Sequence, residues 1–239
     1  MSFQRPCIGA AGLSVNPAAE LELPRLDEIE KRYLTAGQIR GLAAAASEHG
    51  ALVLLLGFTG LRFGEAAALT VADIDLVRGR VRVHRSVTAV NAAMIYSAPK
   101  SHQARTVPLP GFLVDALQQH LRGREVNELA FPDSRGGPMR LANVRQRWWA
   151  RAVTASSMPA GCNPHELRHS AASMAISAGA SIKAVQKMLG HKSATLTLDR
   201  YGHLYGDELQ SVADRLDLLH AAAAEKCAQS VPTRLQVVR

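Results

Sequence analysis

The spacing of apolar residues changes from a helical pattern to a strand-like pattern and back again, and this change limits the folds open to the chain. The segment GRVRVHRSVTAV, at 79–90, alternates apolar and polar residues and is rich in valine, as half-buried strands are. MIYSAPK at 94–100 and ARTVPLP at 104–110 continue the pattern. We expect three short strands in one small antiparallel sheet, with a turn over 99–103 between the last two.

Helical patterns lie on both sides of this sheet. Thr35 is expected to cap a helix whose apolar side includes Ile39 and Leu42, and 51–58 is expected to be a buried helix that ends at Thr59-Gly60. The predicted fold class is therefore mainly α with a small antiparallel β-sheet (α+β). Further helices are predicted over Gly111–Leu121, Leu141–Thr154, Pro164–Ser177, Ser181–Leu189, Ser193–Arg200 and Glu208–Glu225.

The charge balance favours a polyanionic partner, because 28 Lys and Arg against 20 Asp and Glu give a formal net charge of +8. The cysteines, Cys7, Cys162 and Cys227, form no C-x-x-C pair, which argues against a disulfide framework or a cysteine zinc site. The longest apolar run, 51–58, is far short of the roughly 20 residues that a membrane span needs. The N-terminus lacks a signal-peptide pattern. We predict a soluble cytoplasmic protein without a membrane partner.

Four polar side chains near the C-terminal end have the chemistry to act on a phosphodiester. His165 and Arg168 share one face of a predicted helix. A guanidinium matches phosphate oxygens, and a histidine exchanges protons near neutral pH. His191 follows a helix-ending glycine, and Tyr201 lies ten residues beyond it. A tyrosine is a weak nucleophile unless cations stabilise the developing charge, and Arg62 is a further cation that could do so.

The same segment contains the pattern H-E-x-x-H, from His165 through Glu166 to His169, which is a zinc-protease signature. Zinc proteases carry this motif well inside a helix and need a third ligand downstream, for which His191 would be the candidate. Here the motif falls in the first helical turn. We therefore disfavour a metal site and expect His169 to be a packed or surface histidine.

Four segments in order resemble the tyrosine recombinase family, and in particular phage-type integrases: TGLRFGEAAAL, PKSHQARTVPL, HELRHSAAS and LGHKSATLTLDRYGHL. The resemblance runs from about Tyr33 to Leu204. It implies the catalytic-domain fold of that family over 31–205, preceded by a linker-like segment over 1–30 and followed by a C-terminal helix and tail over 206–239.

The resemblance implies roles for the cationic residues. Arg62 and Arg168 would clamp the scissile phosphate, and Glu65 would support Arg62 from one helical turn away. Lys100 would reach into the minor groove and protonate the leaving 5′ oxygen. Arg105 is a nearby cation that competes for this position, and it is a candidate DNA contact.

The resemblance also implies the remaining catalytic roles. His165 would assist proton transfer from the tyrosine, and His191 would hydrogen-bond a phosphate oxygen. Tyr201 would form a 3′-phosphotyrosyl link that preserves the bond energy, so that no metal or other cofactor is required. Beyond the site, the basic segment LANVRQRWWARAV favours phosphate contacts by Arg145 and Arg147, with a merely solvated basic face as the alternative.

The implied function is site-specific recombination or integration of double-stranded DNA, in association with the nucleoid. The implied partners are three further copies, in a homo-tetramer on paired DNA sites, and an accessory DNA-bending protein. Family members place a helical DNA-clamping domain before the catalytic domain, so we expect this chain to be a catalytic half derived from a phage or mobile element. The alternatives are a catalytically idle DNA-binding remnant and, behind it, a zinc metallopeptidase.

Overall fold

The computed structural model describes residues 32–91, 93–99, 104–156, 158–159, 161–205, 213–221 and 223. The chain divides into two compact units, Met1–Lys31 and Arg32–Arg239, and all the described residues belong to the second. The predicted linker over 1–30 and the end of the predicted tail lie outside the described residues. Within the described part, no helix is both long and apolar enough to cross a membrane.

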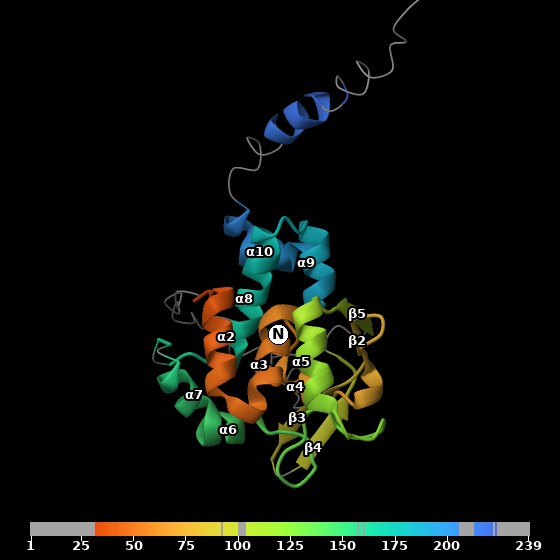
Figure 1. Ribbon diagram of the computed structural model, residues 1–239, viewed down its shortest axis with the longest axis vertical. Helices are drawn as coiled ribbons and strands as arrows, with labels where there is room; N and C mark the ends of the chain where they lie inside the picture. Colours follow the sequence, from red (N-terminus) through yellow and green to blue (C-terminus); the bar gives the residue numbers. More distant parts are fainter. Residues whose placement is uncertain are drawn as a thin grey trace, which may run out of the picture. The chain divides into compact units, whose positions relative to one another are not determined.

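α2 (Ala36–Ala45), a 3-10 turn (Ser47–His49) and α3 (Gly50–Thr59) follow one another along the chain. Of these first helices, α3 lies in the middle of the folded part and α2 lies beside it (Figure 1). Thr35 caps α2 as predicted: its hydroxyl accepts from the Gln38 backbone N–H, and the Gln38 side chain accepts from the Thr35 N–H. α3 packs against α2, α5 and α8, which explains why its sequence is apolar on nearly every side.

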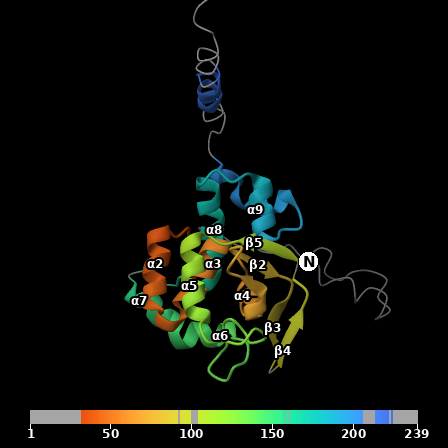
Figure 2. The same cartoon turned by 45° about the vertical axis from the view of Figure 1, so that its right-hand side comes forward.

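Among the described residues, five strands form two antiparallel sheets, whereas a single sheet was expected from the sequence. β1 (Ile74–Asp75), β2 (Arg80–Val83) and β5 (Arg105–Pro108) form one sheet in the order β1-β2-β5. β3 (Ser86–Val90) pairs with β4 (Ala93–Ser97) in the other. In Figure 2, β3 and β4 form a ribbon that extends away from β2 and β5.

The valine-rich segment divides into β2 and β3 where two side chains turn toward Asp73. Nη2 of Arg85 lies 2.8 Å from Asp73 Oδ2, and Nδ1 of His84 lies 3.3 Å from Asp73 Oδ1. The prediction that a turn over 99–103 joins two paired strands was therefore wrong. That connection leads from one sheet to the other, because β4 pairs with β3 and β5 pairs with β2.

The remaining helices follow the predicted order with small changes at their ends. The predicted helix over 141–154 contains a π-helical turn at Arg145–Trp149 between two α-helical parts. Asn163 caps α8 by accepting the His165 backbone N–H at 2.9 Å. The elements are α4 (Phe63–Ala66), α5 (Gly111–Leu121), α6 (Leu141–Val144), α7 (Ala150–Ala155), α8 (Pro164–Ser177), α9 (Ile182–Leu189), α10 (Ala194–Tyr201) and a 3-10 turn at Gly202–Leu204; residues 213–221 are also helical.

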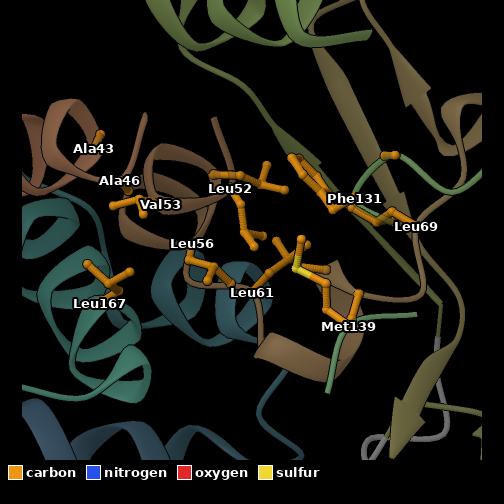
Figure 3. Packing of buried hydrophobic residues seen from close by; sticks show 14 of the residues in the cluster. Ala43, Ala46, Leu52, Val53, Leu56, Leu61, Leu69, Phe131, Met139 and Leu167 are labelled. Atoms are coloured by element: carbon orange, nitrogen blue, oxygen red, sulfur yellow. The ribbon is translucent and has the colours of Figure 1, made fainter. Parts of the chain in front are cut away.

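Most buried apolar side chains form one core around α3. Figure 3 shows Leu52 and Leu56 of α3 in its middle, with Leu167 of α8 on one side and Phe131 on the other. A second, smaller cluster lies between α8, α9 and α10, and it includes the ring of Tyr201. Its members are Ala172, Ile176, Val185, Leu189 and Tyr201.

Candidate active site

Arg168 lies where two helix ends meet, and only 3% of it is exposed. Its Nη1 donates to the carbonyl of Gly60 at the end of α3, and its Nη2 donates to the carbonyl of Leu189 at the end of α9, over 2.8 Å. Helix C-termini carry unpaired carbonyls and partial negative charge, so they stabilise a cation. Burial, and then the charge of Arg62, lowers the pKa of Arg168 to about 9, so it remains protonated at neutral pH.

Two glycines make these helix ends possible. Gly60 and Gly190 have φ of 65° and 66°, the left-handed conformation that ends many helices. A Cβ on Gly60 would lie 2.6 Å from Cδ2 of Leu189, and a Cβ on Gly190 would lie 2.8 Å from Nη1 of Arg105. The glycines of T-G-L-R and L-G-H therefore allow the helix ends and an arginine to come together.

Glu65 is a fully buried carboxylate with two arginine partners. It accepts from the backbone N–H of Arg62 at 2.8 Å and from Arg62 Nη1 at 3.1 Å. Arg105 donates to both carboxylate oxygens, at 2.9 and 2.6 Å. Burial alone would raise the pKa of Glu65, but the hydrogen bonds and charges of Arg105 and Arg62 outweigh it and hold that pKa below its ordinary value. The carboxylate is thus ionised at neutral pH.

Arg105 links three elements from inside the protein. Its side chain is 10% exposed, and its Nε donates to the carbonyl of Met188 at 3.1 Å while its other nitrogens donate to Glu65. We expected a DNA contact and a competitor of Lys100 at this position. The structure places the guanidinium between β5, α4 and the end of α9, and its contact with DNA stays a prediction. Lys100 itself lies outside the described residues, so its role stays a prediction.

His191 is 6% exposed and follows the end of α9. Its Nδ1 lies 2.9 Å from the hydroxyl oxygen of Thr197. Burial, and then the charges of Arg168 and Arg62, lowers the pKa of His191 to about 3, so its ring is neutral at physiological pH. His191 lines a hollow of about 660 Å³, and the cationic residues of its lining are Arg105, Lys183, Lys187 and Lys192.

Tyr201, the predicted nucleophile, is fully buried at the end of α10. Its hydroxyl lies 2.8 Å from Nδ1 of His169. Its ring is nearly parallel to that of His191, with an angle of 7° and a centroid separation of 6.4 Å. Burial raises the pKa of Tyr201, and the charges of Arg168 and Arg200 offset this only in part, so the phenol is protonated at neutral pH.

The interpretation of His169 as a packed or surface histidine missed its contact with Tyr201. The available signal was its position four residues after His165, which places both on one face of α8. The two imidazoles meet edge to face, with centroids 4.8 Å apart. In the part of the chain that the structure describes, no three His, Cys, Asp or Glu side chains are grouped so that they could hold a metal ion. The second histidine of H-E-x-x-H instead contacts a phenol.

The basic segment around α6 and α7 presents Arg145 and Arg147 on the surface, and their contacts with DNA stay a prediction. Trp149 is buried and donates from Nε1 to the carbonyl of Cys162 at 2.7 Å, whereas Trp148 stacks on His49 with centroids 4.4 Å apart. Arg147 lines a concavity of about 830 Å³, which we call the arginine cavity. Its cationic lining residues are Arg124, Arg135, Arg140, Arg147 and Arg151.

Comparison with known sequences identifies a family that matches most of this chain. The model of the phage integrase family matches residues 32–208. A tyrosine recombinase XerC from Corynebacterium efficiens is 32% identical over 208 residues, covering 82% of this chain and 59% of the relative. The putative prophage phiRv2 integrase of Mycobacterium tuberculosis is 34% identical over 167 residues, covering 67% of this chain and 44% of the relative. The chain thus spans 59% and 44% of the lengths of these two relatives.

Solved structures share the fold. The Tn1549 transposon integrase in complex with transposon right end DNA superposes with a TM-score of 0.74 at 22% identity, over 89% of this chain and 75% of that one. The catalytic domain of bacteriophage HP1 integrase superposes with a TM-score of 0.56 at 23% identity, over 77% of this chain and 95% of that one. The mainly helical architecture with small antiparallel sheets is therefore that of integrase catalytic domains.

Proposed function

Because the chain belongs to the phage integrase family, we propose that it cuts and rejoins double-stranded DNA at specific sites through a 3′-phosphotyrosyl intermediate. The observation that carries this proposal is the convergence of Arg62, Arg168, His191 and Tyr201 from four parts of the chain. The charges of both arginines act on His191, and the charge of Arg168 acts on Tyr201. A nucleophile and a neutral hydrogen-bonding ring thus lie within one cationic site.

Arg62 and Arg168 would hold the scissile phosphate in different ways. The side chain of Arg62 is 24% exposed, so its guanidinium is accessible to a phosphate. Arg168 is bonded to two helix ends and supplies a positive charge that is fixed before DNA arrives. Both would stabilise the charge that builds up on the phosphorane, and loss of one such donor typically slows the chemical step by roughly 10²–10³-fold.

The reaction balances with the groups proposed from the sequence. An electron pair of the Tyr201 oxygen forms a bond to phosphorus, and the bond from phosphorus to the 5′ oxygen breaks. The phenol proton passes to the imidazole of His165, as the resemblance implies, and the leaving 5′ oxygen takes a proton from the ammonium group of Lys100. His191 would donate from Nε2 to a non-bridging oxygen, which follows if the hydroxyl of Thr197 donates to Nδ1. Because Tyr201 is fully buried, DNA binding must expose its hydroxyl.

Contacts along the duplex would come from the exposed arginines and lysines. Arg145 is exposed, Arg147 lines the arginine cavity, and Lys183, Lys187 and Lys192 line the hollow beside His191. Lysine and arginine contacts to phosphates release counterions, so binding would weaken steeply as salt rises. We propose that full recombination needs four copies on two DNA sites and an accessory DNA-bending protein, in association with the nucleoid.

The direct experiment uses a pool of nicked duplexes with a randomised central sequence. We expect the wild-type protein to form a covalent adduct that survives denaturation, and the DNA in that adduct reports the target site. Tyr201→Phe keeps the buried ring but lacks the nucleophilic oxygen, so it should form no adduct. An adduct with Tyr201→Phe would remove Tyr201 from its role.

The second candidate function is DNA binding without cleavage, and the complete burial of Tyr201 is the observation that favours it. The same experiment separates the two candidates. Wild-type protein that binds the duplexes but yields no covalent product would establish the idle DNA-binding protein in place of the recombinase.

A further inference from the structure

The hydroxyl of Tyr201 has a histidine beside it that the family resemblance did not assign. Nδ1 of His169 lies 2.8 Å from the phenol oxygen, across 32 residues of sequence. The two side chains come from α8 and α10; His169 is half-buried, and Tyr201 is fully buried in the cluster between these helices. It directly engages the atom that would attack phosphorus.

The phenol is able to donate this hydrogen bond. Tyr201 is protonated at neutral pH because burial raises its pKa, so its O–H donates to Nδ1 in the tautomer of His169 that leaves Nδ1 without a hydrogen. A neutral imidazole that accepts at Nδ1 carries its hydrogen on Nε2. His169 is thus arranged as a proton acceptor for the nucleophile before any DNA is present.

The other two histidines of the site are arranged differently. Nδ1 of His191 is occupied by the hydroxyl of Thr197, and its ring lies parallel to the phenol with centroids 6.4 Å apart. The ring of His165 meets His169 edge to face, which suits it to fix the orientation of that ring. His169 has the geometry of a general base toward Tyr201, because the two heavy atoms lie within hydrogen-bond reach of each other.

We propose that His169 takes the phenol proton as Tyr201 attacks the phosphate, with His165 as a positioning residue for its ring. This inference rests on the proposed strand-cleavage function and changes the role given to His165 from the family resemblance. As the new bond from oxygen to phosphorus forms, the O–H bond breaks and its proton moves to Nδ1, leaving an imidazolium. In the rejoining step that imidazolium returns the proton to the phenolate oxygen.

The test separates proton acceptance from positioning. In His169→Asn, the amide oxygen can stand near the place of Nδ1 and accept the phenol hydrogen bond, but it cannot take the proton. We expect adduct formation with the nicked duplexes to slow by roughly 10²–10⁴-fold, the usual contribution of a general base. DNA affinity and the melting temperature should match wild type. The control, His203→Asn, alters a neighbouring histidine that pairs with Tyr33 and should leave the rate unchanged.

Two further measurements would not change if His169 had only a structural role. Replacing the bridging 5′ oxygen by sulfur gives a leaving group that needs no proton, so the His169→Asn defect should persist while a Lys100→Ala defect disappears. The wild-type rate should level off with rising pH once the His169 ring is neutral, whereas the His169→Asn rate should keep rising. The titratable and charged groups facing this pair are His165 and Arg168 of α8, Arg200 of α10, His191 and Tyr33.

Each outcome decides the matter. A slowed His169→Asn protein with the altered pH profile and a persistent defect on the sulfur substrate supports the inference. An unchanged or faster rate, against wild-type protein that forms the adduct and Tyr201→Phe that does not, overturns it while the proposed function stands. No adduct with wild-type protein overturns both.

Discussion

The carboxylate of Glu65 and the guanidinium of Arg105 face each other through two hydrogen bonds of 2.9 and 2.6 Å. Both contacts are shorter than the side-chain contact of 3.1 Å between Glu65 and Arg62. Through Glu65 and the carbonyl of Met188, Arg105 ties the short helix behind Arg62 to the end of α9. The proposed phosphate clamp is therefore positioned by an arginine that need not touch the phosphate.

Arg105→Ala should strongly destabilise the protein, because it leaves the buried carboxylate of Glu65 without its main partner. Breaking a buried ion pair from one side costs about 3–5 kcal/mol. The control is Arg78→Ala, which breaks an exposed pair with Asp75 and should destabilise the protein far less, because solvent screens that pair. Urea unfolding of both variants gives the comparison. Equal costs would mean that Arg105 does not stabilise the interior.

The low pKa of His191 predicts a loss of stability in mild acid. Unfolding returns the pKa of this ring from about 3 to about 6.5, so the unfolded chain binds the extra proton. This stability is present above about pH 6.5 and is lost as the pH falls toward about 3, by at most about 1.4 kcal/mol per pH unit. Subtracting the unfolding free energies of His191→Gln from those of wild type should isolate this slope. Parallel pH profiles would contradict it.

Gly190→Ala should cost more than the backbone conformation alone explains. Gly136 also has positive φ, of 80°, but no atom lies within 4 Å of where its Cβ would be. Gly136→Ala therefore measures left-handed strain alone, about 1–2 kcal/mol. Gly190→Ala adds a clash with Arg105, and thermal unfolding should place its melting temperature clearly below that of Gly136→Ala. If both variants have the same melting temperature, the end of α9 must shift to admit the methyl group without a loss of stability.

Thr197→Val should remove the partner of His191 Nδ1 while keeping the shape of the buried side chain. An unsatisfied buried group costs about 1–3 kcal/mol. The ring of His191 should also lose its fixed tautomer, so adduct formation should slow as well. Thr197→Ser keeps the hydroxyl and should recover most of the rate. A valine variant as fast as the serine variant would show that the hydrogen bond does not orient His191.

Arg147→Ala should weaken DNA binding across all sequences and lower the salt dependence of binding by about one unit of slope, as loss of one phosphate contact does. Arg40→Ala, which removes an exposed arginine of α2, is the matched control. Fluorescence anisotropy over a series of salt concentrations measures both slopes. Identical slopes for the two variants would mean that the segment is a solvated basic face.

The sequence predicts best what depends on neighbouring residues. Thr35 caps its helix and Asn163-Pro164 begins α8, because capping is decided within four residues. The contact between Glu65 and Arg62 was likewise accessible from their spacing of three. The pairing of the strands could not be predicted in this way. His84 and Arg85, between β2 and β3, contact Asp73, which is distant in sequence, and the two strands belong to different sheets.

Two long-range contacts of the site were hidden for the same physical reason. Arg105 meets Glu65 across 40 residues, and His169 meets Tyr201 across 32. An arginine at the start of a strand carries no local mark of a buried partner, and the spacing of His169 from His165 indicates a shared helix face but not the phenol beside it. Only the packing of the fold brings those pairs together. The sequence therefore shows which residue types are present, but it does not show which residues they contact.

Arg168 of α8 donates to carbonyl groups at the ends of α3 and α9. These contacts affect which residues would change first in a gene that is no longer selected for strand cleavage. In a descendant without the proposed strand cleavage, Arg168 would still bind the two helix ends, and Glu65 and Tyr201 would still fill buried positions. Intact buried residues are thus a record of folding as much as of catalysis. Arg62 is partly exposed, so we expect substitutions to appear there first if strand cleavage is no longer under selection.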